Sequence, residues 1–347
     1  MFSNEDIMIS GGMPMYNSEL YVREALVCLQ KQTYKNFEVI IVDNCSTDHS
    51  VEIVEQMNDE RFHVYINEEN KGLLYSLQRG VRLAKGKYIA RLDSDDVCEP
   101  QRFEKQIQYM EAHEDVMLCG CKGYALIEGK RVETPTYPVY GKHALKFSLL
   151  YKNYCLIHSA FMFRRKELEN AGVRYEKFQH CQDYHLSLAV SEKHELYMLP
   201  EELVGYRIHA DQLSQTDSNE LIISEDNALK KIYMDHIGLE ERYQAILLKA
   251  NARTLKGCKE IECFIQMMER HAELIGVNIR QKNTDEYLCA QFVLWDICTS
   301  QDHRNIRLLW KYVSSYYRNL KWLLGDKVGF LWALCCIFGY DARGKKE

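Results

Sequence analysis

The sequence contains no apolar run that is long enough to cross a lipid bilayer. The best candidate, residues 328–338, has only 11 residues and is interrupted by Gly329, whereas a membrane-spanning helix needs about 20 apolar residues. The chain also shows no secretory signal, no internal repeat and no low-complexity segment. We therefore expect a cytoplasmic protein made of globular domains, and the length of 347 residues favours two of them.

Ordered cysteine patterns and dinucleotide-binding glycine patterns are missing as well. The 13 cysteines are scattered, and neither Cys119 with Cys121 nor Cys335 with Cys336 has the spacing of zinc ligands. Reduced thiols are the simplest interpretation. No G-x-G-x-x-G motif follows a strand-like segment, so a dinucleotide-dependent oxidoreductase is disfavoured.

Charge is unevenly distributed along the chain, whose net charge is −6. Residues 304–347 contain nine Lys or Arg against three acidic residues, a surplus of +6, so residues 1–303 carry −12. The basic segment also contains aromatic residues, among them Trp310, Trp322 and Trp332. Basic and aromatic residues together favour contact with an anionic membrane surface, which we expect for residues 321–347; packing of the aromatics against the protein is the alternative. We expect no nucleic-acid partner.

The first 121 residues alternate between strand-like and helix-like patterns. Helical patterns separate the apolar segments, and the first helix is expected to use Asn17 or Ser18 as its N-cap. Such alternation is typical of an α/β fold with a mostly parallel sheet and helices on both faces. The segments of strand length lie at 37–42, 62–65, 88–92 and 116–121.

The rest of the chain changes character twice. Residues 122–215 are mixed, with an extended segment at 157–163 and a helix at about 183–192. From about residue 218 onward the periodicity is helical only. We therefore expect a first domain over 1–215 and a helical C-terminal region over 216–347.

Three carboxylates lie within four residues where the apolar strand 88–92 ends. Side chains alternate along an extended chain, so Asp93 and Asp95 are expected to project from the same side. Carboxylates this close repel one another unless a cation lies between them, and Mg²⁺ or Mn²⁺ takes such oxygen ligands together with water and substrate phosphates. A solvated acidic turn, with Asp96 as a helix or turn cap, is the alternative.

The order of these motifs resembles the family 2 glycosyltransferases, which are inverting enzymes with a GT-A-type nucleotide-sugar fold. The resemblance covers roughly residues 7–215, and it implies a GT-A-type catalytic domain over 1–215, followed by the helical region. Residues 1–121 would form its nucleotide-binding half and 122–215 its acceptor half. The motifs that carry the resemblance are Pro14–Asn17, Gln32–Asp48, Ala84–Asp96, His158–Ser159, Arg164–Arg165, Gln182–Tyr184 and Tyr206–His209.

The resemblance implies a divalent metal, Mn²⁺ or Mg²⁺, that stabilises the departing diphosphate as a Lewis acid. Asp95 would contact the metal directly, and Asp93 would contact the donor ribose or the metal. Asp96 would support them. His209 would bind metal or phosphate, with a structural role as the alternative.

The resemblance also assigns the nucleotide contacts. Asp43 and Asn44 would hold the base, although the second position is commonly an Asp that contacts uracil. An amide both donates and accepts, so a UDP-sugar or a dTDP-sugar is expected. Pro14 and Tyr16 would lie beside the base, and plain packing is the alternative for Tyr16. Two further residues would contact the donor: Gly72 through its backbone, unless it is simply a turn glycine, and Arg207 through its phosphates.

Asp183 is the expected general base, which removes the proton of the acceptor hydroxyl as that oxygen attacks the sugar. The family has a Glu-Asp pair here, and this chain has Gln182 and Asp183. An acidic residue favoured by the helix dipole is an interpretation that can hold at the same time. His158 and Arg164 would lie on the acceptor side.

The expected function is therefore transfer of a sugar from a nucleoside-diphosphate donor to a saccharide or lipid-linked saccharide, in surface polysaccharide synthesis at the cytoplasmic face of the membrane. One departure is the pair Gly11 and Gly12, which forgo about 1.5–3 kcal/mol of burial each in the first strand. A non-catalytic binding paralogue is the rival interpretation that these glycines and Asn44 favour. A sugar-nucleotide pyrophosphorylase is a weaker rival, because its longer glycine-rich phosphate loop is absent.

Overall fold

The structure is a computed structural model, and the residues that it describes fall into two compact units, 1–230 and 231–347. The division lies inside α9 (Asn219–His236), somewhat beyond the boundary at 215 and 216 that the sequence predicts. The described residues are 8–132, 141–151, 157–175, 178–210, 212, 219–251, 255, 257–281, 284–290 and 293.

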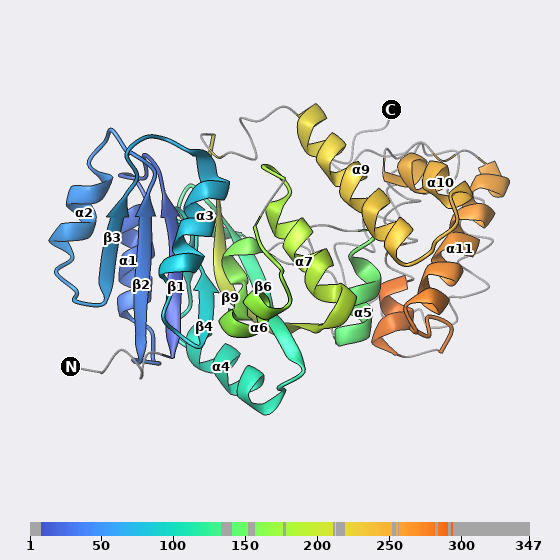
Figure 1. Ribbon diagram of the computed structural model, residues 1–347, viewed down its shortest axis with the longest axis horizontal. Coiled ribbons are helices and arrows are strands. Elements are labelled where there is room, and N and C mark those ends of the chain that lie inside the picture. Colours follow the sequence, from blue (N-terminus) through green and yellow to red (C-terminus); the bar gives the residue numbers. More distant parts are fainter. Residues whose placement is uncertain are drawn as a thin grey trace. The chain divides into compact units, whose positions relative to one another are not determined.

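A single sheet organises the first unit (Figure 1). Its strand order is β3-β2-β1-β4-β8-β6-β9-β5, with β7 paired to β6. The strands are β1 (Ile9–Met15), β2 (Phe37–Asp43), β3 (Phe62–Ile66), β4 (Tyr88–Arg91), β5 (Val97–Cys98), β6 (Val116–Ile127), β7 (Lys130–Val132), β8 (Met162–Arg164) and β9 (Glu195–Ile208).

The sheet is parallel in its first half and mixed beyond β4. Strands β1 to β4 pair in parallel, as the βαβ pattern predicts. The expected extended segment at 157–163 is instead a short 3₁₀ helix (His158–Ala160) followed by β8, which pairs antiparallel with both β4 and β6. Strand β6 runs parallel to β9 over most of its length. This insertion of β8 places His158 and Ser159 beside the end of β4.

Helices cover both faces of the sheet. Alternate residues of β1 and β2 pack with apolar side chains of α1, α2 and α4 in one core. The opposite face of β1 and β2 lies against α3. The helices of this unit are α1 (Val22–Gln30), α2 (Ser50–Gln56), α3 (Gly72–Leu83), α4 (Arg102–Ala112), α5 (Lys142–Ser148), α6 (Arg165–Asn170) and α7 (Gln182–Lys193).

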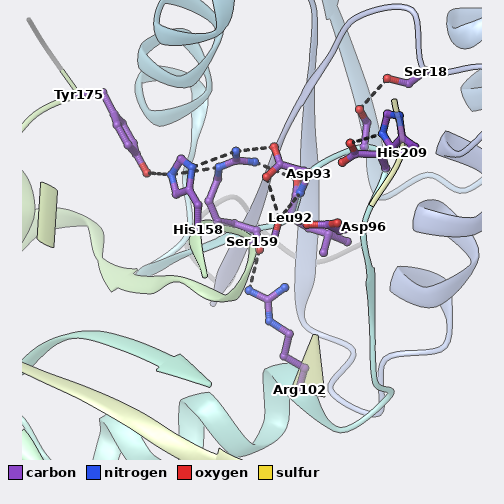
Figure 2. A network of polar contacts seen from close by, with 12 residues as sticks. Ser18, Leu92, Asp93, Asp96, Arg102, His158, Ser159, Tyr175 and His209 are labelled. Atoms are coloured by element: carbon purple, nitrogen blue, oxygen red, sulfur yellow. Dashed lines mark hydrogen bonds and ion pairs between the residues drawn. The ribbon is translucent and has the colours of Figure 1, made fainter. Parts of the chain in front are cut away.

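The predicted start of the first helix is wrong by one turn. Helix α1 begins at Val22, and its N-cap residue Tyr21 makes no side-chain capping bond. Asn17 has a positive φ of 46°, and its side chain accepts a hydrogen bond from the backbone of Thr47 at 2.9 Å. Ser18 bonds the Ser94 hydroxyl at 2.7 Å (Figure 2). Both predicted caps therefore tie neighbouring loops together at the carboxyl edge of the sheet.

The glycine pair of β1 has a different consequence at each position. An added Cβ on Gly11 would lie 3.4 Å from Glu38 O and from a Val39 methyl, and one on Gly12 would lie 3.7 Å from an Ile89 methyl. A cavity of about 20 Å³ between β1 and α3 is lined by Gly12 and, on the helix, by Gly80. The missing side chain at Gly12 thus leaves unfilled space in the fold.

We predict that Gly12→Ala stabilises the protein by about 1 kcal/mol. The methyl group fits at an ordinary contact distance, buries apolar surface, and reduces the freedom of the unfolded chain. Urea denaturation of both proteins measures the difference. Gly86→Ala is the matched control, because its Cβ would lie 2.6 Å from Ser10 N and must destabilise the strand. A Gly12→Ala protein that is less stable than the wild type would show that the cavity cannot accept the methyl group.

The second unit is helical where it is described, as the sequence predicts. Helices α10 (Arg242–Asn251) and α11 (Gly257–Leu274) pack against each other and bury apolar side chains such as Leu247, Phe264 and Met267. Among the described residues, none of the helices has the length and apolar character needed to span a membrane. The predicted membrane-contacting segment, residues 321–347, lies outside the described residues.

Candidate functional site

The acidic cluster lies directly after β4, at the edge where the parallel strands end. Asp93 accepts a hydrogen bond from Arg91 Nη2 at 2.6 Å and another from the Ser159 hydroxyl at 2.8 Å. Asp96 is 1% exposed and accepts from the Arg207 backbone at 2.8 Å. The third carboxylate, on Asp95, has one side-chain partner among the described residues, His209 Nε2, at 3.0 Å. Figure 2 shows Asp93, Asp96 and His209 around this turn.

Three carboxylates in so small a space perturb one another. Burial raises the pKa of Asp93, but the Arg91 cation and hydrogen bonds outweigh burial and bring the pKa below its usual value. Burial and the charge of Asp93 raise the pKa of Asp95. Burial, followed by the charges of Asp95 and Asp93, raises the pKa of Asp96 well above the usual value. Among the described residues, Asp93 alone pairs with a permanent cation, Arg91, while Asp95 pairs with the His209 imidazole, so a further positive charge would stabilise the cluster.

Asp95 and His209 form the part of the cluster that fits a divalent metal. Their side chains are 25% and 16% exposed, and His209 Nδ1 is buried without a hydrogen-bond partner among the described residues. Within those residues no three His, Cys, Asp or Glu side chains are grouped so as to hold a metal by themselves. Mg²⁺ and Mn²⁺ commonly use one or two protein ligands and complete their shell with water and substrate phosphates. Asp95 and His209 therefore match the number and type of protein ligands that such a coordination shell uses.

Arg207 contacts the Asp95–His209 pair from the protein interior and holds it in place. Its Nε donates to the Asp95 carbonyl at 2.7 Å, and its Nη2 donates to Glu24 of α1 at 2.6 Å. The guanidinium carbon also lies 4.9 Å from the centre of the Tyr21 ring, which in turn contacts the His209 ring at 4.6 Å. The Arg207 side chain, 6% exposed, is buried and connects β9, α1 and the acidic turn. The antiparallel pairing of β5 with β9, in which Val97 lies opposite Gly205, brings Arg207 to this turn.

Asp43 and Asn44 lie at the end of β2 and are both bonded within the protein. The Asp43 carboxylate accepts from the Ser46 backbone at 3.0 Å and from its hydroxyl at 2.6 Å. The Asn44 amide donates to Asn70 at 2.6 Å and accepts from Asn67 at 2.9 Å. Asn44 thus anchors the loop between β3 and α3, and sequence reasoning did not foresee this network of three amides.

The remaining nucleotide-side residues surround the same corner. Pro14 lies in the buried end of β1, whereas the Tyr16 side chain is 47% exposed just beyond it. Gly72 begins α3 with a φ of 82°, a conformation that favours glycine, and its amide donates to Asn70 at 3.0 Å. These positions meet at the carboxyl edge of neighbouring strands, where ligands bind in open α/β sheets.

A buried polar chain runs from the acidic turn toward Tyr175. Arg91, 2% exposed, contacts His158 at 3.4 Å as well as Asp93, and His158 Nε2 lies 2.8 Å from the Tyr175 hydroxyl. Figure 2 shows Asp93, His158 and Tyr175 along this chain. Burial and the Arg91 charge hold the pKa of His158 well below its usual value, so its ring is neutral. Sequence reasoning missed Arg91 and Tyr175, although an arginine inside an apolar strand was a usable signal.

Asp183 lies in the first turn of α7, close enough to the same cluster to be affected by its charges. Its pKa is raised to about 6, mainly by burial and in part by the charge of Asp93, against the lowering effect of backbone hydrogen bonds and of Arg91. The Tyr184 backbone donates to its Oδ1 at 2.7 Å. Asp183 is therefore a carboxylate that ionises near neutral pH beside the acidic turn, the property expected of a general base.

Arg164 lies away from this site. Its donors are occupied by the Val116 carbonyl at 2.9 Å, the Tyr88 hydroxyl at 2.8 Å, the His113 carbonyl at 3.2 Å and the Met110 carbonyl. The last two of these carbonyls are at the end of α4, so Arg164 caps that helix. The structure brings together Asp93, Asp95, Asp96, Arg207 and His209, with His158 and Asp183 nearby, but not Arg164.

Comparison with known proteins gives consistent matches. Residues 10–172 match the family model for glycosyl transferase family 2. An uncharacterised glycosyltransferase of Rickettsia prowazekii is 32% identical over 63% of this chain and 70% of its own length. The amylovoran biosynthesis glycosyltransferase AmsE of Erwinia amylovora is 28% identical over 60% of this chain and 79% of its own. A crystal structure of S. aureus TarS with UDP-GlcNAc superimposes with a TM-score of 0.58, at 19% identity, over 82% of this chain and 88% of that one.

Proposed function

The chain belongs to glycosyltransferase family 2, and we propose that it is a metal-dependent, inverting glycosyltransferase that moves a sugar from a nucleoside-diphosphate donor to a saccharide acceptor. One observation carries the proposal. The Asp95–His209 pair lies at the same sheet edge as Asp93 and Arg91, whose charges affect the pKa of Asp183. Relatives such as AmsE support a role in bacterial surface polysaccharide synthesis. The fold is of the GT-A type seen in TarS.

Asp95 and His209 would hold Mn²⁺ or Mg²⁺, and Asp93 would contact the donor ribose or the metal. When bound, the metal stabilises the negative charge of the departing diphosphate. Asp96 supports the turn through Ser159 and the Arg207 backbone. Arg207 positions Asp95 from behind, so in this proposal it supports the phosphate site and does not clamp phosphate itself.

Asp183 would accept the proton of the acceptor hydroxyl in a single displacement. Its pKa of about 6 leaves it ionised at neutral pH and still basic enough to take a proton in the transition state. His158, whose pKa is lowered by burial and by Arg91, and Tyr175 would form the adjoining polar wall of the acceptor side. Because Gln182 replaces the usual glutamate of the pair, Asp183 would act without a neighbouring carboxylate in the sequence.

The base of the donor would lie over Pro14 and Tyr16 and against the corner formed by Asp43 and Asn44, with the Gly72 backbone at its side. Since the Asn44 amide is bonded to Asn67 and Asn70, it would shape the loop around the base. We expect a uridine or thymidine diphosphate sugar at this corner, and in support TarS was crystallised with UDP-GlcNAc and with UDP.

A thermal-shift screen of nucleoside diphosphates with and without Mn²⁺ tests the proposal. We expect at least one of them to raise the melting temperature, with the larger rise in Mn²⁺, because a ligand at 100 times its Kd adds about 2.7 kcal/mol of stability. If none of them stabilises the protein in the presence of Mn²⁺, the donor proposal fails, and a paralogue without transfer activity becomes the better account.

We further predict that the basic segment binds anionic membranes at the cytoplasmic face, as suits a lipid-linked acceptor. The surplus of +6 over residues 304–347 should attract acidic lipids by about 1 kcal/mol per basic residue near the surface, and salt should weaken that attraction. Co-sedimentation with phosphatidylserine liposomes should fall as salt rises and drop sharply on truncation after Asn319. Full-length protein that ignores these liposomes at low salt would contradict the prediction.

A further inference from the structure

Two cysteines that the proposed reaction does not use face each other in the first unit. Cys28 lies on α1, and Cys98 lies in β5, two residues after Asp96. Their Sγ atoms are 3.3 Å apart, and the Cys98 backbone N–H donates to Cys28 Sγ at 3.1 Å. Helix α1 packs on β5, so packing in the core holds the two sulfur atoms close together although they are distant in sequence.

The two thiols differ in solvent exposure and in pKa. Cys98 is 5% exposed, whereas Cys28 is partly exposed. The Gln32 amide donates to Cys98 Sγ at 3.3 Å. The hydrogen bond from the Cys28 thiol, followed by the Arg102 charge, lowers the pKa of Cys98 against the effect of burial. The same thiol pair and burial raise the pKa of Cys28. Cys98 is thus the more acidic of the two thiols, and Cys28 is the less acidic and more accessible one.

We propose that Cys28 and Cys98 form a dithiol site that reacts with small disulfides and with trivalent arsenicals. The sulfur atoms need to approach by only about 1.3 Å to reach the disulfide length of about 2.05 Å. In a two-step exchange, Cys28 would react with the external disulfide first. Cys98, whose thiolate is the better stabilised of the two, lies within reach of Cys28 Sγ for the second step. The site lies behind the acidic turn and does not depend on the proposed transfer activity.

Reaction with oxidised glutathione proceeds in two balanced steps. Cys28 loses its proton to solvent, and its thiolate attacks the external disulfide, so one glutathione thiolate leaves and a mixed disulfide forms. Cys98 then loses its proton, and its thiolate attacks Cys28 Sγ, forms the internal disulfide and expels the second glutathione thiolate. The two departing thiolates take up two protons from solvent. The protein loses two electrons and two protons, and one disulfide molecule becomes two thiols. Because the hydrogen bond with Cys98 and burial raise the pKa of Cys28, the first step should set the rate and accelerate with pH.

Incubation of the full chain with oxidised glutathione, followed by maleimide quenching and non-reducing peptide mapping, tests the site. We expect a peptide pair linked through Cys28 and Cys98, without a stable glutathione adduct at Cys28. Cys98→Ser should instead trap glutathione on Cys28, and Cys28→Ser should abolish the link. Cys45→Ser is the control, because Cys45 is partly exposed but bonds only the Glu68 carbonyl. A stable adduct at Cys28 in the wild type, a link from Cys98 to the neighbouring Cys121, or no reaction would overturn the proposal.

Phenylarsine oxide gives a second test that needs no oxidation. The arsenical condenses with two thiols and releases water, so it is retained only where two sulfur atoms can reach one arsenic. The wild type and Cys45→Ser should both protect Cys28 and Cys98 from maleimide in its presence, and a competing dithiol should reverse that protection. Loss of protection in Cys28→Ser alone and in Cys98→Ser alone is expected. Protection of Cys98 that survives in Cys28→Ser would contradict the pairing.

Discussion

Replacing Asp183 with asparagine should leave nucleotide binding intact and slow sugar transfer by about 10²–10⁴-fold, the usual contribution of a general base. The substitution keeps the shape of the side chain and removes its ability to accept the proton. Steady-state kinetics should show the loss in kcat, with the diphosphate-induced thermal shift unchanged. Glu192→Gln, the same change near the far end of α7, is the control and should be nearly neutral. Transfer within a few-fold of the wild type would show that another group is the base.

The pH dependence offers an independent check of the same residue. Transfer by the wild type should rise with pH through about 6, the pKa that burial gives to Asp183, and the variant should lack this rise. Stability changes in the opposite direction. Because the folded pKa exceeds the unfolded value, the unfolded chain binds fewer protons between about pH 4 and 6, and stability falls as pH rises through that range. Asp183→Asn should therefore melt higher than the wild type above pH 6, which separates lost activity from lost folding.

Asp95→Ala should abolish the Mn²⁺-dependent part of any stabilisation by a nucleoside diphosphate. Among the described residues, His209 is the side-chain partner of the Asp95 carboxylate, so removing Asp95 takes away the proposed direct carboxylate ligand and leaves the imidazole with Asp93, which is tied to Arg91. The measurement is the thermal shift with diphosphate in Mn²⁺ and in chelator, for the variant and the wild type. Asp115→Ala is the control, because Asp115 precedes β6, away from the acidic turn, and pairs with Lys142. An unchanged metal response in Asp95→Ala would remove Asp95 from the metal site.

The sequence predicts those parts of the fold that depend on local patterns. The strands at 37–42, 62–65, 88–92 and 116–121 and their order as βαβ units agree with β2, β3, β4 and β6. Strands β2, β4 and β6 are buried apolar runs, whereas β3 is mostly half-buried. The antiparallel insertion of β8 between β4 and β6 has no local signal. It depends on pairing between segments far apart in the chain, and a 3₁₀ turn interrupts the apolar run that appeared extended.

The candidate site could likewise be predicted only in part from the sequence. The Asp93–Asp96 turn and Asp183 could be recognised from residue type and position, but their partners could not. Asn44 appeared free to contact a base, whereas Asn67 and Asn70 occupy its amide. Arg164 appeared to belong to the acceptor side, but it caps α4. Long side chains such as these reach several possible partners, and only the packed structure decides among them.

A calorimetric titration tests the central claim most directly. The nucleoside diphosphate that stabilises the protein most is titrated into the wild-type chain in Mn²⁺ and, separately, in excess chelator. Metal held by Asp95 and His209 and shared with the diphosphate predicts binding at least about tenfold tighter in Mn²⁺, a difference of about 1.4 kcal/mol. Equal affinity in the two buffers would contradict a metal-dependent donor site at this edge of the sheet.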